Sequence, residues 1–212
     1  MADSIGASIS SAPKQERSKQ TREKIIQAAI QLINTKGYEK TSSNDIAAEA
    51  GVSVGSFYTY FADKRQILLT IFDRLSNDLS NDIFDTIGPE HLFDKDLRGN
   101  IRLAIANALD NEGKRTGLQR AIHEMVIKDS EFAERRKAVM QKSISKLREL
   151  ISLAKKAGLT CEVDPDTAAF IVHRVVFDLS QDYISECCEL DKEIAIDALT
   201  DMIYRYVFLQ QS

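Results

Sequence analysis

The chain has 212 residues, which is enough for one large or two small domains with a buried core. Its net charge of −4 at pH 7 argues against indiscriminate binding to nucleic acids. It has no run of about eighteen apolar residues, so no membrane-spanning helix is expected. The first residues lack a basic start followed by an apolar run, so no secretory signal is expected and the predicted location is the cytoplasm.

Charge is distributed unevenly along the chain. Residues 1–66 contain nine Lys and Arg against seven Asp and Glu, a net charge of +2, whereas residues 67–212 have a net charge of −6. Within the first part, the basic residues concentrate between Lys14 and Lys24. A charge run is usually a solvated face, but this asymmetry favours an N-terminal part that meets phosphates and a C-terminal part that does not.

The N-terminal segment, residues 1–17, is rich in Ser, Ala and Gly and predicts a disordered arm. Two roles stay open for it: a passive tail, which we favour, or a basic arm that touches phosphates or a minor groove. A first helix is predicted from about Ser18 to Lys36, because its apolar residues share one face and Gly37 can end it.

Two short helices are predicted within residues 41–64. Ser42 and Asp45 have the spacing of a capping box, which predicts the start of the first. Gly51 can adopt the left-handed conformation that ends a helix sharply, and Ser53 predicts the N-cap of the second. Two short helices at a steep angle around a glycine turn form a helix-turn-helix, whose second helix enters the DNA major groove.

The stretch G-Y-E-K-T-S-S-N-D-I-A-A-E-A-G-V-S-V-G-S-F-Y-T-Y-F-A-D-K, residues 37–64, resembles the DNA-binding signature of the TetR family of bacterial transcriptional regulators. The resemblance covers about Ser18 to Leu69, and the remainder resembles the family only in length and helical layout. It implies an all-α protein with an N-terminal helix-turn-helix three-helix head and a C-terminal helical ligand-binding and dimerisation domain. The implied boundaries are a DNA-binding domain at residues 18–66 and an effector-binding and dimerisation domain at residues 67–212.

Carried over position by position, the resemblance implies a set of DNA-contacting residues in and around the two short helices. They are Ser43, Asn44, Ser53, Val54, Gly55, Ser56, Tyr58, Thr59, Tyr60 and Lys64. The hydroxyl groups and the lysine suit phosphates, and Gly55 permits a close backbone approach. Val54 and Thr59 offer methyl groups to thymine, while Asn44 and Thr59 can hydrogen-bond base edges.

The second short helix has no Arg or Gln for a bidentate base contact, so specificity is expected to depend on methyl contacts, Asn44 and DNA shape. Phe57 and Phe61, spaced i, i+4, are assigned to the core. Tyr58 and Tyr60 stay open between DNA contact and cover of the core, because tyrosine can do either with its hydroxyl outward.

The rest of the chain predicts helices only. A long helix is expected at about residues 63–87, where Asp63 and Gln66 suggest a second capping box and Gly88-Pro89 a stop. Apolar stripes predict further helices at residues 97–109, 118–126 and 130–157, from Asp164-Pro165 to about Cys188, and from Asp191 to about Leu209.

The last two predicted helices are apolar on more than one side, so they need cover on two sides. A dimer interface and a deep monomer core are both compatible with this pattern. We favour the homodimer, because members of the family that it resembles pair these helices and a symmetric operator needs a two-fold protein.

No catalytic constellation is present, so no enzyme activity is predicted. His123-Glu124 begins like the zinc motif H-E-x-x-H, but Ile127 stands where the second histidine belongs. Cys161, Cys187 and Cys188 lack metal-ligand spacing; reduced thiols are the favoured interpretation and a redox pair is the alternative. No metal and no cofactor are expected.

The C-terminal domain is expected to hold a small apolar or amphipathic effector in a mainly apolar pocket. The candidate ligand-binding residues are Phe72, His123, Met125 and Phe177, with Leu75, Leu103, Val126 and Phe170 as further lining and Arg120, Glu124, His173 and Arg174 as further polar anchors. The predicted function is a repressor that leaves a palindromic double-stranded DNA operator when the effector binds. A DNA-binding module without a ligand or controlled by a protein partner is the alternative, and an enzyme with a DNA-binding head is a weaker one.

Overall fold

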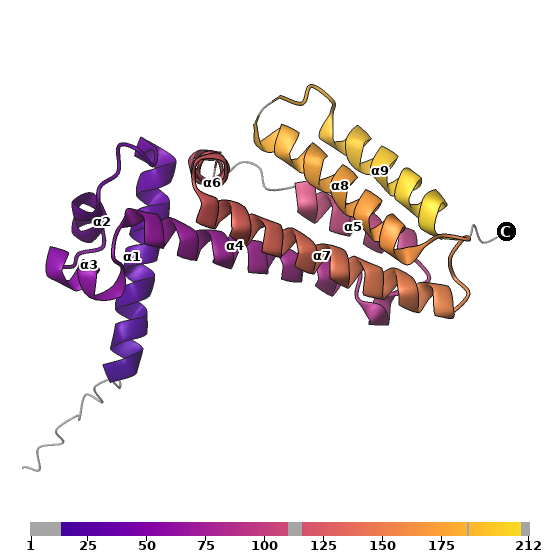
Figure 1. Ribbon diagram of the computed structural model, residues 1–212, viewed down its shortest axis with the longest axis horizontal. Helices are drawn as coiled ribbons and strands as arrows, with labels where there is room; N and C mark the ends of the chain where they lie inside the picture. Colours follow the sequence, from indigo (N-terminus) through magenta and orange to yellow (C-terminus); the bar gives the residue numbers. More distant parts are fainter. Residues whose placement is uncertain (1–13, 110–115, 186, 209–212) are drawn as a thin grey trace, which may run out of the picture. The chain divides into compact units, whose positions relative to one another are not determined.

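The computed structural model describes residues 14–109, 116–185 and 187–208. The predicted arm lies outside these residues up to position 13. The described elements are helices and one short 3₁₀ turn, coloured along the chain in Figure 1. They are α1 (Lys14–Lys36), α2 (Ser43–Glu49), α3 (Val54–Tyr60), α4 (Lys64–Thr86), η1 (Pro89–His91), α5 (Leu97–Leu109), α6 (Thr116–Lys128), α7 (Ser130–Lys156), α8 (Pro165–Ile184) and α9 (Lys192–Val207). This confirms the all-helical prediction for the part of the chain that is described.

The chain forms two compact units, residues 1–68 and residues 69–212, and the division falls within α4. In the first unit, hereafter the head, α2 packs against both α1 and α3. Its core consists of apolar side chains from all three helices, among them Ile25, Ala29, Ile46 and Phe57, which are fully buried. The head is therefore a three-helix cluster closed by the first helix, as predicted.

The first helix begins at Lys14 rather than near Ser18, so residues 14–17 are helical and the predicted boundary is corrected. These residues, Lys-Gln-Glu-Arg, carry no apolar stripe, which is why the sequence suggested an arm. All four residue types nevertheless have high intrinsic helix propensity and extend the helix beyond its buried face.

The turns of the head have the predicted capping chemistry. The Ser42 hydroxyl accepts a hydrogen bond from the Asp45 amide at 3.1 Å, and the Asp45 carboxylate accepts one from the Ser42 amide at 2.9 Å. The Asp45 carboxylate also accepts a hydrogen bond from the Ser42 hydroxyl at 2.6 Å, and this bond, followed by the one from the Ser42 amide, holds the pKa of Asp45 below its usual value. Gly51 has φ +66°, a left-handed conformation that lets the chain turn directly into α3.

The second predicted capping box is only partly formed. The Asp63 carboxylate accepts a hydrogen bond from the Gln66 amide at 2.7 Å, as expected for an N-cap. The Gln66 side chain, however, accepts its hydrogen bond from the amide of Ala62 at 2.6 Å and not from that of Asp63. The glutamine is one bond longer than the aspartate of α2, so it reaches one residue further back.

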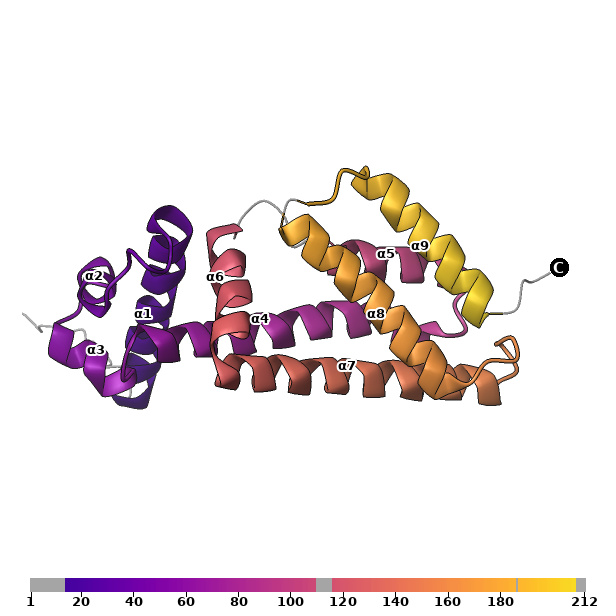
Figure 2. The same ribbon diagram turned by 45° about the horizontal axis from the view of Figure 1, so that its top comes forward.

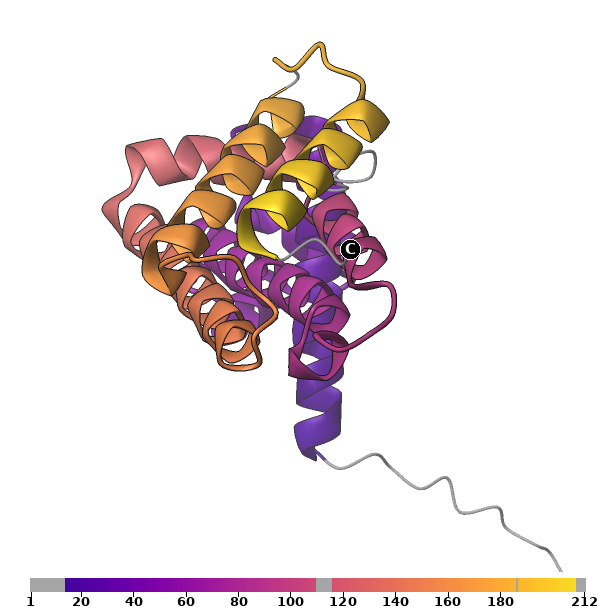
Figure 3. The same cartoon turned by 90° about the vertical axis from the view of Figure 1, so that its right-hand side faces the viewer.

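In the second unit, hereafter the C-terminal unit, α7 packs along α8 and α6, and α5 packs against α9 and α8. Figure 2 shows α6 crossing near the start of α7, while the last turn of α9 lies towards the other end of α7. Figure 3 shows α8 and α9 side by side on one face, and the two helices contact each other. The core cluster of this unit draws on α5, α7, α8 and α9.

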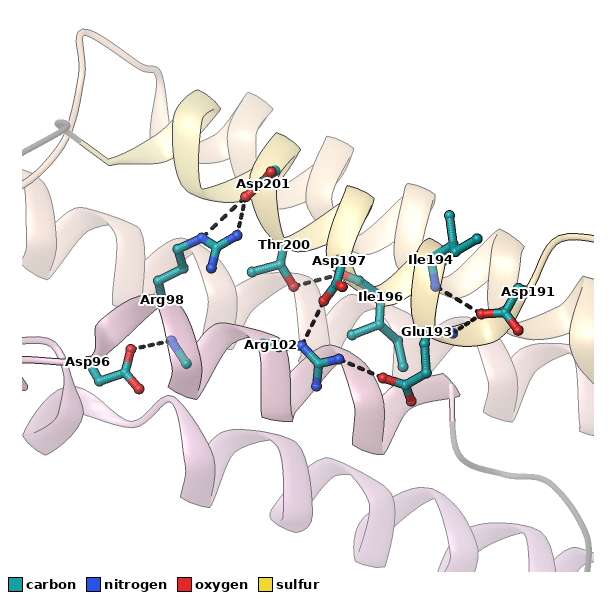
Figure 4. Close-up of polar contacts among 11 residues, drawn as sticks. Asp96, Arg98, Arg102, Asp191, Glu193, Ile194, Ile196, Asp197, Thr200 and Asp201 are labelled. Atoms are coloured by element: carbon teal, nitrogen blue, oxygen red, sulfur yellow. Dashed lines mark hydrogen bonds and ion pairs between the residues drawn. The ribbon is translucent and has the colours of Figure 1, made fainter.

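A row of ion pairs joins α5 to α9 on the outside of the C-terminal unit (Figure 4). Arg98 pairs with Asp201, and Arg102 bridges Asp197 at 2.7 Å and Glu193 at 2.6 Å. The bonds with Arg98 hold the pKa of Asp201 below its usual value. Exposed pairs of this kind add little stability one by one, so they fix the register of the two helices more than they hold the unit together.

Two helix ends in this unit differ from prediction. α8 ends at Ile184 instead of near Cys188, because the apolar run that suggested a longer helix counts two cysteines that lie beyond its C-cap, Ser185. The Tyr183 hydroxyl donates a hydrogen bond to the Leu190 carbonyl at 2.9 Å, which folds the following segment back. α9 ends at Val207, and Leu209 lies outside the described residues.

Within residues 14–109, 116–185 and 187–208, no helix combines the length and the apolar composition that crossing a membrane requires. The same ranges contain no group of three or more His, Cys, Asp or Glu side chains placed to hold a metal ion.

Candidate functional site

The exposed face of α3 is the first candidate site. Ser53 caps this helix by accepting a hydrogen bond from the Ser56 amide at 3.1 Å. Phe57 is fully buried and the Phe61 side chain is only 2% exposed, so the prediction that these two rings belong to the core is confirmed. Tyr58 lies on the other side, 55% exposed, with Val54 at 42%. The helix therefore has one anchored face and one accessible face.

The inner face of α3 is held by aromatic contacts. The rings of Phe57 and Phe61 lie 6.2 Å apart, and the Arg22 guanidinium sits 5.1 Å from the centroid of Phe61. The ring centroids of Tyr58 and Phe57 lie 5.2 Å apart, and the two rings are nearly perpendicular. These contacts join α1 and α3, so the orientation of the accessible face is fixed by the core beneath it.

The predicted DNA-contacting residues are all exposed or half-buried in the structure, and none belongs to the core. Ser43 and Asn44 lie in the first turn of α2, while the members from Ser53 to Tyr60 form α3 and its cap. Gly55 is exposed, and a Cβ atom built there meets only the Ser53 hydroxyl, at 4.0 Å. The Thr59 hydroxyl donates to the Gly55 carbonyl at 3.1 Å, which leaves its methyl group free to face outward.

Lys64 differs from the other predicted contacts because its ammonium is already engaged within the head. It donates a hydrogen bond to the Tyr38 carbonyl at 2.8 Å and lies 4.3 Å from the centroid of the Tyr38 ring. An ammonium has three N–H donors, so one further acceptor, such as a phosphate oxygen, still fits.

The second candidate site is a cavity of about 320 Å³ inside the C-terminal unit. Its walls come from α4 to α9 and are mainly aliphatic and aromatic. Of the predicted ligand-binding residues, Phe72, His123 and Phe177 line it, whereas Met125 does not. Met125 lies about 100° around α6 from Val126, which does line it.

Of the other predicted lining residues, some lie in the cavity wall and others lie on the surface. Leu75, Val126 and His173 lie in the cavity wall. Leu103 and Phe170 are 53% and 54% exposed, so their prediction as lining residues is wrong. Phe170 lies on the outer side of α8, which is apolar on more than one side, and Leu103 lies on the outer side of α5.

Two histidines that line this cavity each have an unsatisfied ring nitrogen. The Nδ1 atoms of His123 and His173 are buried, and neither has a hydrogen-bond partner among the described residues. Burial, and to a smaller extent the charge of Arg174, lowers the pKa of His173 below its ordinary value, which favours the neutral imidazole. His173 also stacks on Phe177 with ring centroids 5.7 Å apart.

Sequence reasoning missed one charged lining residue, Arg136 on α7. Its guanidinium lies 6.0 Å from the centroid of the Phe177 ring. A signal for it was present in the sequence: Arg136 precedes Val139, Met140 and Ser143 at the helical spacing of the inner face of α7, and all of these line the cavity.

The sequence around the first of these sites matches a known protein family. Residues 25–71 match the family described as "Bacterial regulatory proteins, tetR family". The regulator EthR of Mycolicibacterium smegmatis is 30% identical over 143 residues, which is 68% of this chain and 63% of EthR. The chain spans less than two thirds of the length of the first curated relatives that it matches, and only 31% of YvdT of Bacillus subtilis.

Solved structures extend the likeness to the whole fold. A Mesorhizobium loti chain described as a TetR-family transcriptional regulator has a TM-score of 0.75 at 18% identity, covering 91% of this chain and 99% of that one. SmeT of Stenotrophomonas maltophilia, solved as a complex with triclosan, has a TM-score of 0.69 at 19% identity over 89% of this chain and 92% of SmeT. The family consists of DNA-binding transcription regulators and not of enzymes. With its signature matched in the head and its fold matched over nearly all of its length, the chain belongs to the TetR family.

Proposed function

We propose that this protein is a dimeric transcriptional repressor that leaves its operator when a small apolar or amphipathic molecule occupies the cavity of the C-terminal unit. The observation that carries the proposal is that one chain combines an accessible helix-turn-helix surface with a mainly apolar cavity. In this proposal residues 18–66, which lie within the head, bind DNA. Residues 67–212 bind the effector and form the dimer.

The DNA-binding part of the proposal is supported by the chemistry of the exposed face. Hydroxyl groups of Ser56, Tyr58 and Tyr60 can bind phosphates, which positions the head on the duplex. Val54 and Thr59 can meet thymine methyl groups, and Asn44 can meet a base edge. The helix-turn-helix places such side chains in the major groove, with the two heads of a dimer about 34 Å apart.

The dimer is supported by apolar side chains left exposed on α8 and α9. Phe170, Ile171, Ile194 and Met202 are between 40% and 60% exposed, and Tyr206 is 37% exposed. Monomeric proteins rarely leave so many large apolar groups in contact with water on adjacent helices. A two-fold partner would cover them and would match a palindromic operator.

Ligand control is supported by the cavity, whose volume falls at the lower end of the range typical of small-molecule sites. The neighbour SmeT is described as a complex with triclosan, so a small molecule is held by a protein of the same fold. If the effector prefers one form of the dimer and DNA the other, each must weaken the binding of the other by the same factor. Helix α4, whose residues belong to both units, is the proposed connection.

The test is binding of the purified protein to DNA from just upstream of its own gene, compared with shuffled DNA, across a salt series. We expect affinity for both DNAs to fall with salt and a gap between them to persist, because base contacts survive counterion release. Val54→Ala and Thr59→Ala should each reduce the difference between the affinities for the upstream DNA and the shuffled DNA. A gap unchanged in both variants would contradict the assigned base contacts.

Phosphate contact by Lys64 is tested separately. Lys64→Met should reduce affinity for both DNAs alike and lower the salt slope by about one, since one fewer counterion is released. Lys36→Met, at an exposed lysine in the last turn of α1, is the matched control and should change neither. Circular dichroism of both variants separates loss of a contact from loss of the fold.

A further inference from the structure

The wall of the cavity in the C-terminal unit has an unusual charge pattern. Its lining contains many aliphatic and aromatic side chains, a few hydroxyls and amides, two histidines and a single formal charge, that of Arg136. Among the described residues that line it, none is Asp or Glu. An arginine in a mainly apolar wall is unfavourable unless an anion or strong acceptors compensate it.

The described part of the chain does not supply that anion. Among the residues that the structure describes, no carboxylate lies within ion-pair distance of the Arg136 guanidinium, whose contact is with the ring of Phe177. Its neighbour in sequence shows the contrast: Arg135 pairs with Asp73 and, at 3.1 Å, with Glu131. Arg174, on the helix opposite, pairs with Asp178 at 3.1 Å. Arg136 is thus a cavity cation without a carboxylate partner among the described residues.

The unsatisfied histidine atoms point to the same chemistry. His173 and Arg136 both lie beside Phe177: the His173 ring centroid is 5.7 Å and the Arg136 guanidinium 6.0 Å from the centroid of the Phe177 ring. The buried Nδ1 atoms of His123 and His173 belong to the same lining. A neutral imidazole can carry its proton on Nδ1 and donate it, so both rings can serve an acceptor that also faces Arg136.

Size and shape limit the ligand further. At about 30 Å³ for each water-sized group, the cavity of 320 Å³ has room for roughly ten non-hydrogen atoms. The polar residues named above come from α6, the first half of α7 and the middle of α8. The wall contributed by α5 and α9 is apolar, and Figure 2 shows α6 and the end of α9 towards opposite ends of α7.

We propose that the cavity binds an amphipathic anion of roughly ten non-hydrogen atoms in all, a carboxylate on an apolar body. Arg136 pairs with the carboxylate, and His123 and His173 donate hydrogen bonds to it from Nδ1. The apolar body extends towards Ile105, Ile151 and Ile203. This inference rests on the proposed function, in that it names the chemical class of the effector.

The first experiment compares three probes by calorimetric titration into the unaltered protein: decanoate, decan-1-ol and decylammonium, each below its micelle-forming concentration. They share the apolar body and differ in the charge of the head. We expect decanoate to bind at least about tenfold more tightly than decan-1-ol, because a charge-assisted pair is added, and the ammonium to bind more weakly than either. Equal affinity for all three, tighter binding of the ammonium, or no binding of decanoate would overturn the proposal.

The second experiment uses variants on α7. Arg136→Met should weaken decanoate binding by about tenfold or more and leave decan-1-ol binding unchanged, since the apolar stem is kept. Lys146→Met is the matched control, because that ammonium lies beside the wall, 3.2 Å from the Ser80 hydroxyl and 4.6 Å from the Phe84 centroid, without lining the cavity. Loss of decanoate binding in Lys146→Met but not in Arg136→Met would refute the assignment.

The histidines are tested by loss and rescue. His173→Leu should weaken decanoate binding about three- to tenfold, whereas His173→Asn, which places an amide N–H near the position of Nδ1, should restore most of it. An asparagine variant no better than the leucine variant would show that the ring only packs. Because the three-probe comparison uses the unaltered protein, it decides the proposal even where a variant fails to fold.

Release of operator DNA, measured with the same three probes, separates this inference from the proposed function. Decanoate that binds through Arg136 without releasing DNA would support the anion site and contradict ligand control of DNA binding. Release by decan-1-ol or the ammonium, with decanoate inactive, would support ligand control and overturn the anion site.

Discussion

The head and the C-terminal unit differ in how completely they use their interiors. In the head, Ile25, Ile46 and Phe57 are fully buried among neighbours on three short helices, and the functional side chains lie outside. The C-terminal unit is larger, yet it contains a cavity of about 320 Å³ and leaves two imidazole nitrogens without partners among its described residues. One unit presents a fixed surface, and the other keeps an interior that can accept something.

This difference follows from the two tasks. A surface that must match a DNA groove needs side chains held by a dense core, since a small tilt of α3 would displace every contact at once. A unit that responds to a ligand needs a place where contacts are still to be made. Polar atoms left unsatisfied inside a cavity are unfavourable, and a ligand that satisfies them stabilises the form to which it binds.

The sharpest test of the comparison is a matched pair of core truncations. Ile25→Ala in the head should cost about 4 kcal/mol of unfolding free energy, because it opens a new void among packed neighbours. Ile105→Ala in the cavity wall should cost nearer 2 kcal/mol, since a side chain that already faces a void has fewer contacts to lose. Peptide-resolved hydrogen exchange assigns each loss to its unit, and equal losses would break the comparison.

A second pair of variants, both in the head, compares a glycine that the backbone conformation requires with a glycine that lets DNA come close. Gly51→Ala should destabilise the head by about 1–2 kcal/mol, because alanine is strained at φ +66°. Gly55→Ala, in an open position of α3, should stabilise the helix by up to about 1 kcal/mol but weaken operator binding by blocking the close approach of DNA. Denaturant titration and DNA binding measure the two effects, and normal operator affinity in Gly55→Ala would remove that role.

The two serines at the start of α3 give a smaller contrast. Ser53→Ala should cost about 1 kcal/mol, because its hydroxyl caps the helix by accepting from the Ser56 amide. Ser56→Ala should leave stability nearly unchanged and reduce DNA affinity only. If both variants lose stability equally, the Ser56 side chain has a structural part that the contacts do not show.

The smallest expected effect is on the pH dependence of folding stability, and it tests the buried histidine of the C-terminal unit. Because burial lowers the pKa of His173 in the folded state, the unfolded chain binds more protons as pH falls below about 6.5, and stability declines across that window. His173→Asn should flatten the decline between pH 7 and 5. The His91 pKa is raised by Asp94 instead, so His91→Asn should change the profile in the opposite direction.

Most of the correct predictions rest on interactions between residues that are close in sequence. The caps at Ser42, Ser53, Asp164 and Asp191 were predictable because capping depends on residues three or four positions apart. The fold class and the burial of Phe57 and Phe61 followed from the same short-range patterns. Which residues touch DNA stays a prediction, because exposure permits a contact without showing one.

The cavity could not be predicted in the same way. Whether Met125 or Val126 faces the space depends on the rotation of α6 against its neighbours, which no local pattern fixes. Phe170 was misplaced because α8 is apolar on more than one side, and Leu103 because it follows the apolar stripe of α5 closely in sequence although it lies on the outer side of that helix. Arg136 was overlooked because a charged residue beside an apolar helix face is usually assigned to the solvent side, whereas the structure places this half-buried arginine in the cavity wall.

The bond between the Lys64 ammonium and the Tyr38 carbonyl has an evolutionary consequence. Since the same ammonium that is proposed to meet a phosphate also holds the turn after α1, any replacement is exposed to two selective pressures at once. A glutamine would keep a donor and lose the charge, and an arginine would keep the charge and misplace the donor. We therefore expect this position to drift less among descendants of the protein than Val54, which can vary with the operator while the architecture beneath it stays the same.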